Sequence, residues 1–147
     1  MERSSVHVVC PHCGAVNRVP TARPAKEAKC GRCHKTLFVG KPLPASAEIF
    51  ERQRTRSEIP IVVDFWAAWC GPCRAMAPAY ERAAAELEPE YRLLKVDTEA
   101  EPALAARYRI RSIPTMVLFA RGQPVAETAG AMNAAGIVSW VRGQRPK

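Results

Sequence analysis

Apolar runs and helix-spaced apolar positions alternate along residues 46–147 of this chain. The run from Ile61 to Trp66 is apolar except at Asp64, which is typical of a central strand buried on both faces. Other short apolar runs predict further strands. Segments in which apolar residues are spaced three or four positions apart, between capping and breaking residues, predict helices. The predicted elements are a helix at 46–56, a strand at 59–66, a helix at 73–87, a strand at 91–96, a helix at 102–108, strands at 115–120 and 124–129, and a helix that Asn133 caps and that ends near Gly143.

The order of these elements predicts an α/β fold in which helices cover both sides of a central sheet. A hairpin turn through Arg121-Gly122 should join the last two strands. In the first helix, Ile49 and Phe50 are expected to face inward. An additional first strand is not obvious, and residues 37–43 are the only candidate for it.

Residues 1–40 contain two short Cys-x-x-Cys segments, which sixteen residues separate. This spacing is typical of zinc ribbons, because two tight turns can place four thiolates around a tetrahedral ion. We therefore predict one zinc ion, structural or redox-sensitive, bound by Cys10, Cys13, Cys30 and Cys33. The metal would supply most of the folding free energy of so small a segment. A reduced, disordered tail and disulfide-forming redox cysteines are the alternatives.

Three histidines, His7, His12 and His34, accompany these cysteines. Four cysteines already complete the ligand set, so we expect the histidines to be bystanders. Residues 41–45 contain two prolines that would hold the chain extended, and we predict a linker there. The expected organisation is a zinc-binding module at 1–40, the linker, and a larger domain at 46–147.

Charge is distributed unevenly between these segments. Residues 1–44 hold eight Lys or Arg against two acidic residues, whereas the remainder holds fourteen against twelve. A basic module could bind nucleic acid or an acidic partner. However, Phe38 is its only aromatic residue, so no platform for base stacking is evident, and we favour a solvated basic face.

The first nine residues are too short and too polar to form the apolar core of a signal peptide, and no apolar run approaches membrane-spanning length. We expect a cytoplasmic protein without a membrane partner. The six cysteines form three Cys-x-x-Cys pairs, which indicates thiol chemistry and metal binding rather than a secreted disulfide scaffold.

The third pair, Cys70 and Cys73, follows the predicted central strand and opens the next helix. A helix N-terminus stabilises a thiolate, and two cysteines on one helical turn can close into a disulfide with little backbone movement. The pair can therefore exchange two electrons by thiol–disulfide exchange.

The residues around this pair resemble the thioredoxin family. Residues 62–76 read VVDFWAAWCGPCRAM, and the further matches are Arg111-Ser112-Ile113-Pro114-Thr115, Gly122 and Gly130-Ala131. The resemblance covers about residues 45–145, and the N-terminal cysteines extend it to the bacterial thioredoxin 2 subgroup. Arg74 replaces a more common lysine and Ala68 a common acidic residue. The resemblance implies a thioredoxin fold with a small zinc-ribbon-like module.

The resemblance also implies the roles of the two thiols. Cys70 would be the attacking thiolate, with its sulfur toward solvent, and the less accessible Cys73 would resolve the mixed disulfide. Asp64 lies in an apolar strand, so burial should raise its pKa and suit it to take the proton from Cys73 through a water. Lys95 on the neighbouring strand is its expected partner. The alternatives are an exposed carboxylate at the strand edge and an ordinary surface lysine.

A docking surface for substrate is implied around Pro114, which should follow a cis peptide bond beside the disulfide. The backbone of Ile113 would pair with an extended substrate segment. The remaining members of this flat, mostly apolar surface would be Trp69, Gly71, Pro72, Gly130 and Ala131. Packing of Trp69 against its own loop is compatible with this function.

We thus expect a monomeric protein-disulfide reductase that uses its redox-active disulfide and one zinc ion. It should need no organic cofactor. Its implied partners are thioredoxin reductase and disulfide-containing client proteins. One alternative is a disulfide oxidase or isomerase of the same fold, against which the Gly-Pro between the cysteines argues. The other is a zinc-ribbon module that binds an acidic partner.

Overall fold

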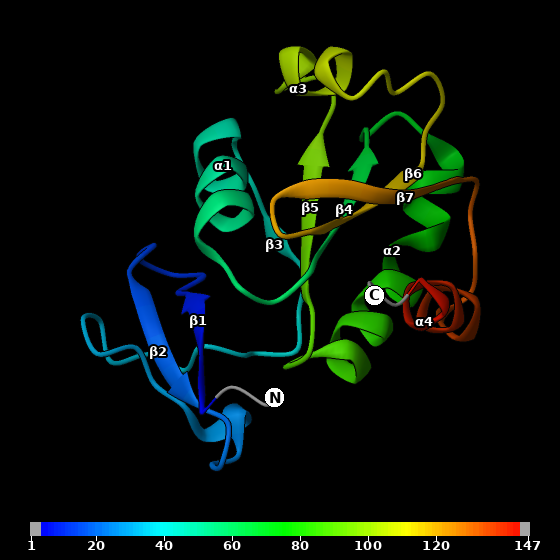
Figure 1. Cartoon of the computed structure of the whole chain (residues 1–147). Helices are drawn as coiled ribbons and strands as arrows, with labels where there is room; N and C mark the ends of the chain where they lie inside the picture. Colours follow the sequence, from blue (N-terminus) through cyan, green and yellow to red (C-terminus); the bar gives the residue numbers. More distant parts are fainter. Residues whose placement is uncertain (1–3, 145–147) are drawn as a thin grey trace.

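The computed structural model of this chain describes residues 4–144. Its main sheet has the strand order β3-β5-β4-β6-β7 (Figure 1). The strands are β3 Leu43–Pro44, β4 Ile61–Trp66, β5 Arg92–Asp97, β6 Thr115–Ala120 and β7 Gln123–Ala129. β4 lies at the centre, parallel to β5 and antiparallel to β6, and β6 pairs with β7 as the predicted hairpin.

Helices cover both faces of this sheet, as predicted (Figure 1). They are α1 Ala47–Arg56, α2 Gly71–Leu87, α3 Pro102–Arg107 and α4 Ala134–Gly143. On one face, α2 and α4 bury a core that includes Met76 and Ile137. On the other face, Phe50 of α1 and Leu104 of α3 pack with Phe119 of β6. The mixed sheet with flanking helices is the expected thioredoxin fold.

Capping side chains start two of the helices where the sequence predicts. The Ser46 hydroxyl accepts the Ile49 N–H at 3.2 Å, and the Asn133 side chain accepts the Gly136 N–H at 2.7 Å. Phe50 faces inward, but the prediction for Ile49 is wrong, because that side chain is 40% exposed. Phe50 points inward and packs edge-on against Phe119. Ile49 is the next position round the helix and instead lies beside the first cysteine segment.

The N-terminal residues form a small module of their own, as the cysteine spacing predicts. A hairpin of β1 Ser5–Val9 and β2 Val16–Pro20 precedes a short 3₁₀ helix at Ala25–Glu27. Val8, Val19, Leu37 and Phe38 form its buried core, together with two of the cysteines. The hairpin was not predicted, since its strands are short and a Cys-x-x-Cys turn separates them.

The predicted linker includes the edge strand β3, which pairs in parallel with β5. Residues 37–43 are the only predicted candidate for an additional first strand, and β3 begins at Leu43, the last of these residues. Ala45 follows it and is buried in the core beside Phe50. No helix in the described part of the chain is both long enough and apolar enough to span a bilayer.

Candidate active site and metal centre

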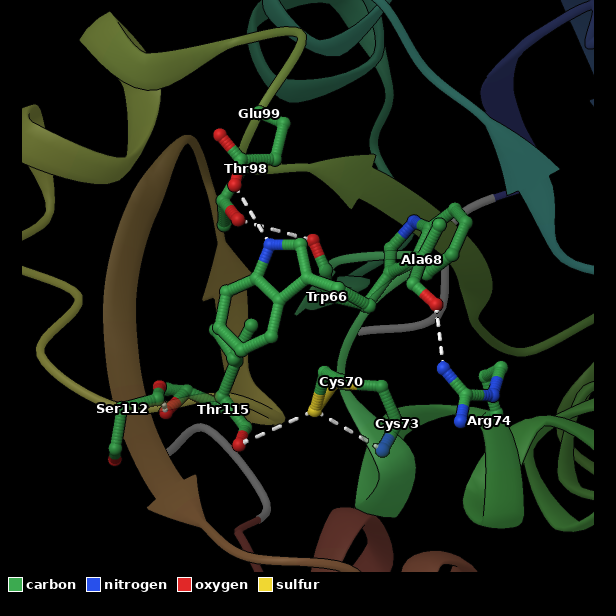
Figure 2. The surroundings of a disulfide bond; sticks show 11 residues. Trp66, Ala68, Cys70, Cys73, Arg74, Thr98, Glu99, Ser112 and Thr115 are labelled. Carbon is green, nitrogen blue, oxygen red and sulfur yellow. Dashed lines mark hydrogen bonds between the residues drawn. A yellow bond between two sulfur atoms is a disulfide. The ribbon is translucent and has the colours of Figure 1, made fainter.

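The Cys70–Cys73 pair forms a disulfide where β4 turns into α2, with Cα atoms 5.3 Å apart. Cys70 is the N-cap residue, and its Sγ accepts the Cys73 N–H at 3.2 Å (Figure 2). Cys70 is 4% exposed and Cys73 is 3% exposed, so in the oxidised state the expected difference in accessibility between the two thiols is absent. Their positions in the helix distinguish them, because Cys70 alone occupies the cap.

The start of α2 is electrostatically suited to a thiolate. No acidic residue lies in its first turn. The N–H groups of this turn have no backbone acceptor within the helix and carry a partial positive charge, which favours an anion at the cap. Arg74 adds a positive charge nearby, and its guanidinium donates to the Ala68 carbonyl at 2.7 Å (Figure 2). The start of the helix is therefore a position that can stabilise a thiolate.

Asp64 is buried in β4, where it is only 2% exposed. Burial raises the pKa of its carboxyl to about 7, and the positive charge of Lys95 opposes that rise. One carboxylate oxygen, Oδ1, has no hydrogen-bond partner among the described residues. Asp64 can consequently hold or release a proton near neutral pH.

Lys95 lies directly opposite Asp64 in the register of β4 and β5. Its ammonium group sits over the ring of Trp66, 4.4 Å from the ring centroid. Within the described residues, no Lys95–Asp64 ion pair shorter than 4.0 Å occurs, so Lys95 acts on the carboxyl at longer range. The exposed-carboxylate alternative for Asp64 does not agree with this burial.

The Ile113–Pro114 peptide bond is cis, as the resemblance implied. The Ile113 carbonyl oxygen lies 3.7 Å from the Cys70 Sγ, so this loop borders the disulfide. Behind it, the Pro114 carbonyl accepts the Gly130 N–H at 2.9 Å, which fixes the loop to the end of β7. The structure thus brings Ile113, Pro114 and Gly130 to one edge of the redox pair.

The surface around the disulfide is open. Trp69 is 66% exposed, and Gly71, Pro72 and Ala131 are also exposed. A methyl group added at Gly71 or at Gly130 would meet no atom within 4 Å other than those of the adjacent backbone. A shallow cavity of about 190 Å³ continues this surface between Trp69 and Ile113.

Glu99 is a site residue that sequence reasoning missed. Its carboxylate accepts the indole N–H of Trp69 at 2.6 Å and so orients the ring across the surface. The two residues are 30 positions apart in the chain. In the sequence, the one signal for this contact is that Glu99 closely follows the predicted strand at 91–96, whose end should lie beside the Cys70–Cys73 motif.

The four N-terminal cysteines converge, and all of their sulfur atoms lie within 4.8 Å of one another. The Cys10–Cys33 and Cys13–Cys30 sulfur pairs are each 3.6 Å apart. A tetrahedral zinc ion with Zn–S bonds of about 2.3 Å requires sulfur separations of about 3.8 Å. The donor set and its spacing therefore fit zinc.

Groups around the cysteines further suit them to thiolate ligation. The Arg32 N–H and the Asn17 amide both approach the Cys30 Sγ, at 3.3 and 3.4 Å. The histidines lie outside the cluster: the His12 ring bonds the Thr36 carbonyl at 3.0 Å, and His7 lies beside Glu58. The cysteines alone could hold the metal.

Comparisons with known proteins agree with both parts of the structure. A family model described as thioredoxin matches residues 41–143, and one described as thioredoxin 2, N-terminal, matches residues 9–35. Thioredoxin C-3 of Corynebacterium nephridii is 39% identical over 134 residues, covering 91% of this chain and 92% of that protein. Thioredoxin 1 of Nostoc sp. is 43% identical over 83 residues, covering 56% and 78%.

A solved structure shows the same fold. A point mutant of thioredoxin from Halobacterium salinarum superposes with a TM-score of 0.66 at 27% identity. The match covers 75% of this chain and 96% of that protein.

Proposed function

Since this chain belongs to the thioredoxin family of thiol–disulfide oxidoreductases, we propose that it reduces protein disulfides with Cys70 as the attacking thiol and Cys73 as the resolving thiol. The Cys70 thiolate attacks one sulfur of a substrate disulfide, and the other sulfur leaves as a thiolate. The Cys73 thiolate then attacks Cys70, which forms the intramolecular disulfide and releases the second substrate thiolate. The observation that supports this most directly is the Cys70–Cys73 disulfide at the cap of α2.

Asp64 is proposed to act as the base for the second step. Its pKa of about 7 allows it to accept the proton of Cys73, through a water, when the mixed disulfide is resolved. Lys95 is proposed to moderate that pKa through its opposing charge. Both residues would act on proton transfer rather than on substrate binding.

The open surface beside the disulfide is proposed to bind an extended segment of the client protein. The Ile113 backbone, next to Pro114, would pair with the segment in the manner of an added strand. The open space at Gly71 and Gly130 supports close approach of a second backbone. Trp69, Pro72 and Ala131 complete the surface.

The oxidised pair must be reduced again after each turnover. We propose that thioredoxin reductase supplies the electrons from NADPH, which makes the protein an electron carrier. A cytoplasmic location is part of the proposal, because free thiolates persist in a reducing compartment. A monomer suffices, since one chain carries every proposed catalytic group, and nucleic acid is not a proposed partner.

Zinc is proposed as the resident metal of a module at residues 1–40, which residues 41–45 join to the redox domain at 46–147. Cys10, Cys13, Cys30 and Cys33 would hold it, and the ion would supply a tetrahedral cross-link between the two cysteine turns. The module lies at the opposite end of β4 from the disulfide, so the ion would be structural with respect to thiol exchange (Figure 1).

Reduction of insulin disulfides tests this function. The purified oxidised protein with NADPH and thioredoxin reductase should consume about one NADPH per chain without insulin and continue to consume NADPH only when insulin is present. Cys70→Ser should abolish the reaction. An intact, disulfide-cycling protein that leaves insulin oxidised under these conditions would contradict it.

A further inference from the structure

Arg92 is the largest fully buried side chain of the described residues, with 1% of it exposed. It begins β5, beside the start of β4 and away from the redox site. A buried guanidinium is costly unless its donors are satisfied. Its hydrogen-bond partners therefore indicate what this residue holds together.

Two of these partners belong to the N-terminal module. One guanidinium nitrogen, Nη2, donates to the Leu37 carbonyl at 2.9 Å and to the Val9 carbonyl at 3.3 Å. The ring of Phe38 covers the guanidinium, with its centroid 4.7 Å from Cζ. Val9 directly precedes the predicted ligand Cys10, so Arg92 contacts the base of the first cysteine turn.

Glu88 joins the same contact from the end of α2. Its carboxylate accepts from Arg92 Nη1 at 3.1 Å and from the Gly40 N–H at 2.7 Å. The side chains of Arg92 and Glu88 are each only 1% exposed. Burial raises the pKa of Glu88 and lowers that of Arg92, while the mutual attraction of the pair opposes both shifts. Removing one partner would therefore leave the other as a buried charge without compensation.

Gln53 of α1 provides a third link. It is 1% exposed, and its amide donates to the Val9 carbonyl at 3.3 Å. The Val9 carbonyl therefore accepts from both Gln53 and Arg92. Val9 is the last residue of β1 and pairs with Val16 of β2 directly before and after the first cysteine turn. A bound metal would cross-link this turn to the second one, and so help to hold the Val9 carbonyl in place.

We propose that Arg92, with Glu88 and Gln53, is the positioning group that couples zinc binding at the four cysteines to the folding of the redox domain. The proposal rests on the zinc site of the proposed function. Loss of the metal frees Val9 and Leu37 and leaves the Arg92 charge buried without two acceptors, which destabilises the start of β5. By linkage, the redox domain in turn tightens the binding of zinc.

The first test measures zinc affinity by competition with a chromogenic chelator, on the full reduced chain. Arg92→Met keeps much of the length of the side chain but removes its donors, and should weaken zinc binding at least tenfold, about 1.4 kcal/mol. Gln53→Leu should weaken it by a smaller factor. Arg142→Met is the matched control, because Arg142 is 42% exposed and pairs with an exposed Glu86. Affinities of both test variants within twofold of wild type would overturn the proposal.

Hydrogen exchange on the unaltered chain gives a second test that does not depend on a variant folding. Removal of zinc by a chelator under reducing conditions should speed exchange at least tenfold around Arg92, with less change in β6. Unchanged protection around Arg92 in the zinc-free protein would also overturn the coupling. A chain that binds no zinc would refute the metal site, whereas insulin reduction would still test the redox site separately.

Discussion

Asp64 shows how one buried side chain links stability to pH. The folded protein holds its pKa at about 7 instead of 3.8, so the folded state binds a proton that the unfolded chain has already lost between these pH values. Stability contributed by this group is therefore present below about pH 4 and is lost as pH rises through 7. Three pH units correspond to roughly 4 kcal/mol, because each unit is worth about 1.4 kcal/mol.

Replacement of Asp64 by Asn should remove this dependence. The stability difference between Asp64→Asn and wild type should grow in favour of the variant by up to roughly 4 kcal/mol between pH 4 and pH 8. Urea unfolding at both pH values measures it, with Glu127→Gln, in the outer strand β7, as the control for loss of one acid. Parallel pH profiles for wild type and Asp64→Asn would show that the carboxyl titrates normally.

The roles of the two thiols give a second prediction at this scale. Cys73→Ser should accumulate a mixed disulfide between Cys70 and an insulin chain, because no thiol remains to resolve it. Cys70→Ser should form no such adduct, since Cys73 lacks the cap position. Mass spectrometry of the trapped species identifies the cysteine involved. Adducts found on Cys73 in the Cys70→Ser protein would reverse the assignment.

At the scale of elements, the periodicity of apolar residues predicted the helices and strands of the redox domain. Most of their ends shift by only one or two residues, because Ser46 and Asn133 mark two helix starts in the sequence itself. The β1–β2 hairpin and β3 were harder to predict, since short strands pair mainly through backbone atoms and carry little pattern. Such elements depend on the surrounding chain and not on their own residues.

The turn that opens α2 offers a test of the docking surface. Gly71→Ala adds a methyl group into open space, so the fold should be unaffected. If client backbones approach there, kcat/KM for insulin should fall roughly fivefold, about 1 kcal/mol, while exchange with a small aromatic disulfide stays unchanged. Gly143→Ala, also in open space but at the end of α4, is the control. Equal losses with both substrates would indicate damage to the thiols instead of to docking.

At the scale of the molecule, the sequence predicted two functional sites but not the contact that joins the module to the redox domain. Spacing identified the four metal-ligand cysteines, whereas the redox pair was identified by its place between the central strand and the next helix and by the resemblance of its neighbours to thioredoxin. Arg92 contacts carbonyls 55 and 83 positions away, and no local pattern reports such a pairing. Arg92 and Glu88 also resemble ordinary surface charges in the sequence, so their burial appears only in the folded structure.

The zinc site should respond to oxidant without loss of the redox site. Mild hydrogen peroxide should oxidise two cysteine ligands to a disulfide, with peroxide reduced to water, and release about one zinc per chain. Reduction should restore cycling of Cys70 and Cys73, which lie at the far end of β4. Native mass spectrometry measures the metal content. Zinc retained after Cys10, Cys13, Cys30 and Cys33 are all replaced by Ser would place the metal elsewhere.

The reduction potential of the Cys70–Cys73 pair tests the central claim most directly. The zinc-loaded protein is equilibrated in dithiothreitol buffers of graded potential, and the oxidised fraction is read after the free thiols are trapped. A protein-disulfide reductase should give a potential of about −270 mV, the value known for thioredoxin. A potential of about −120 mV would identify a disulfide oxidase and contradict the proposed function.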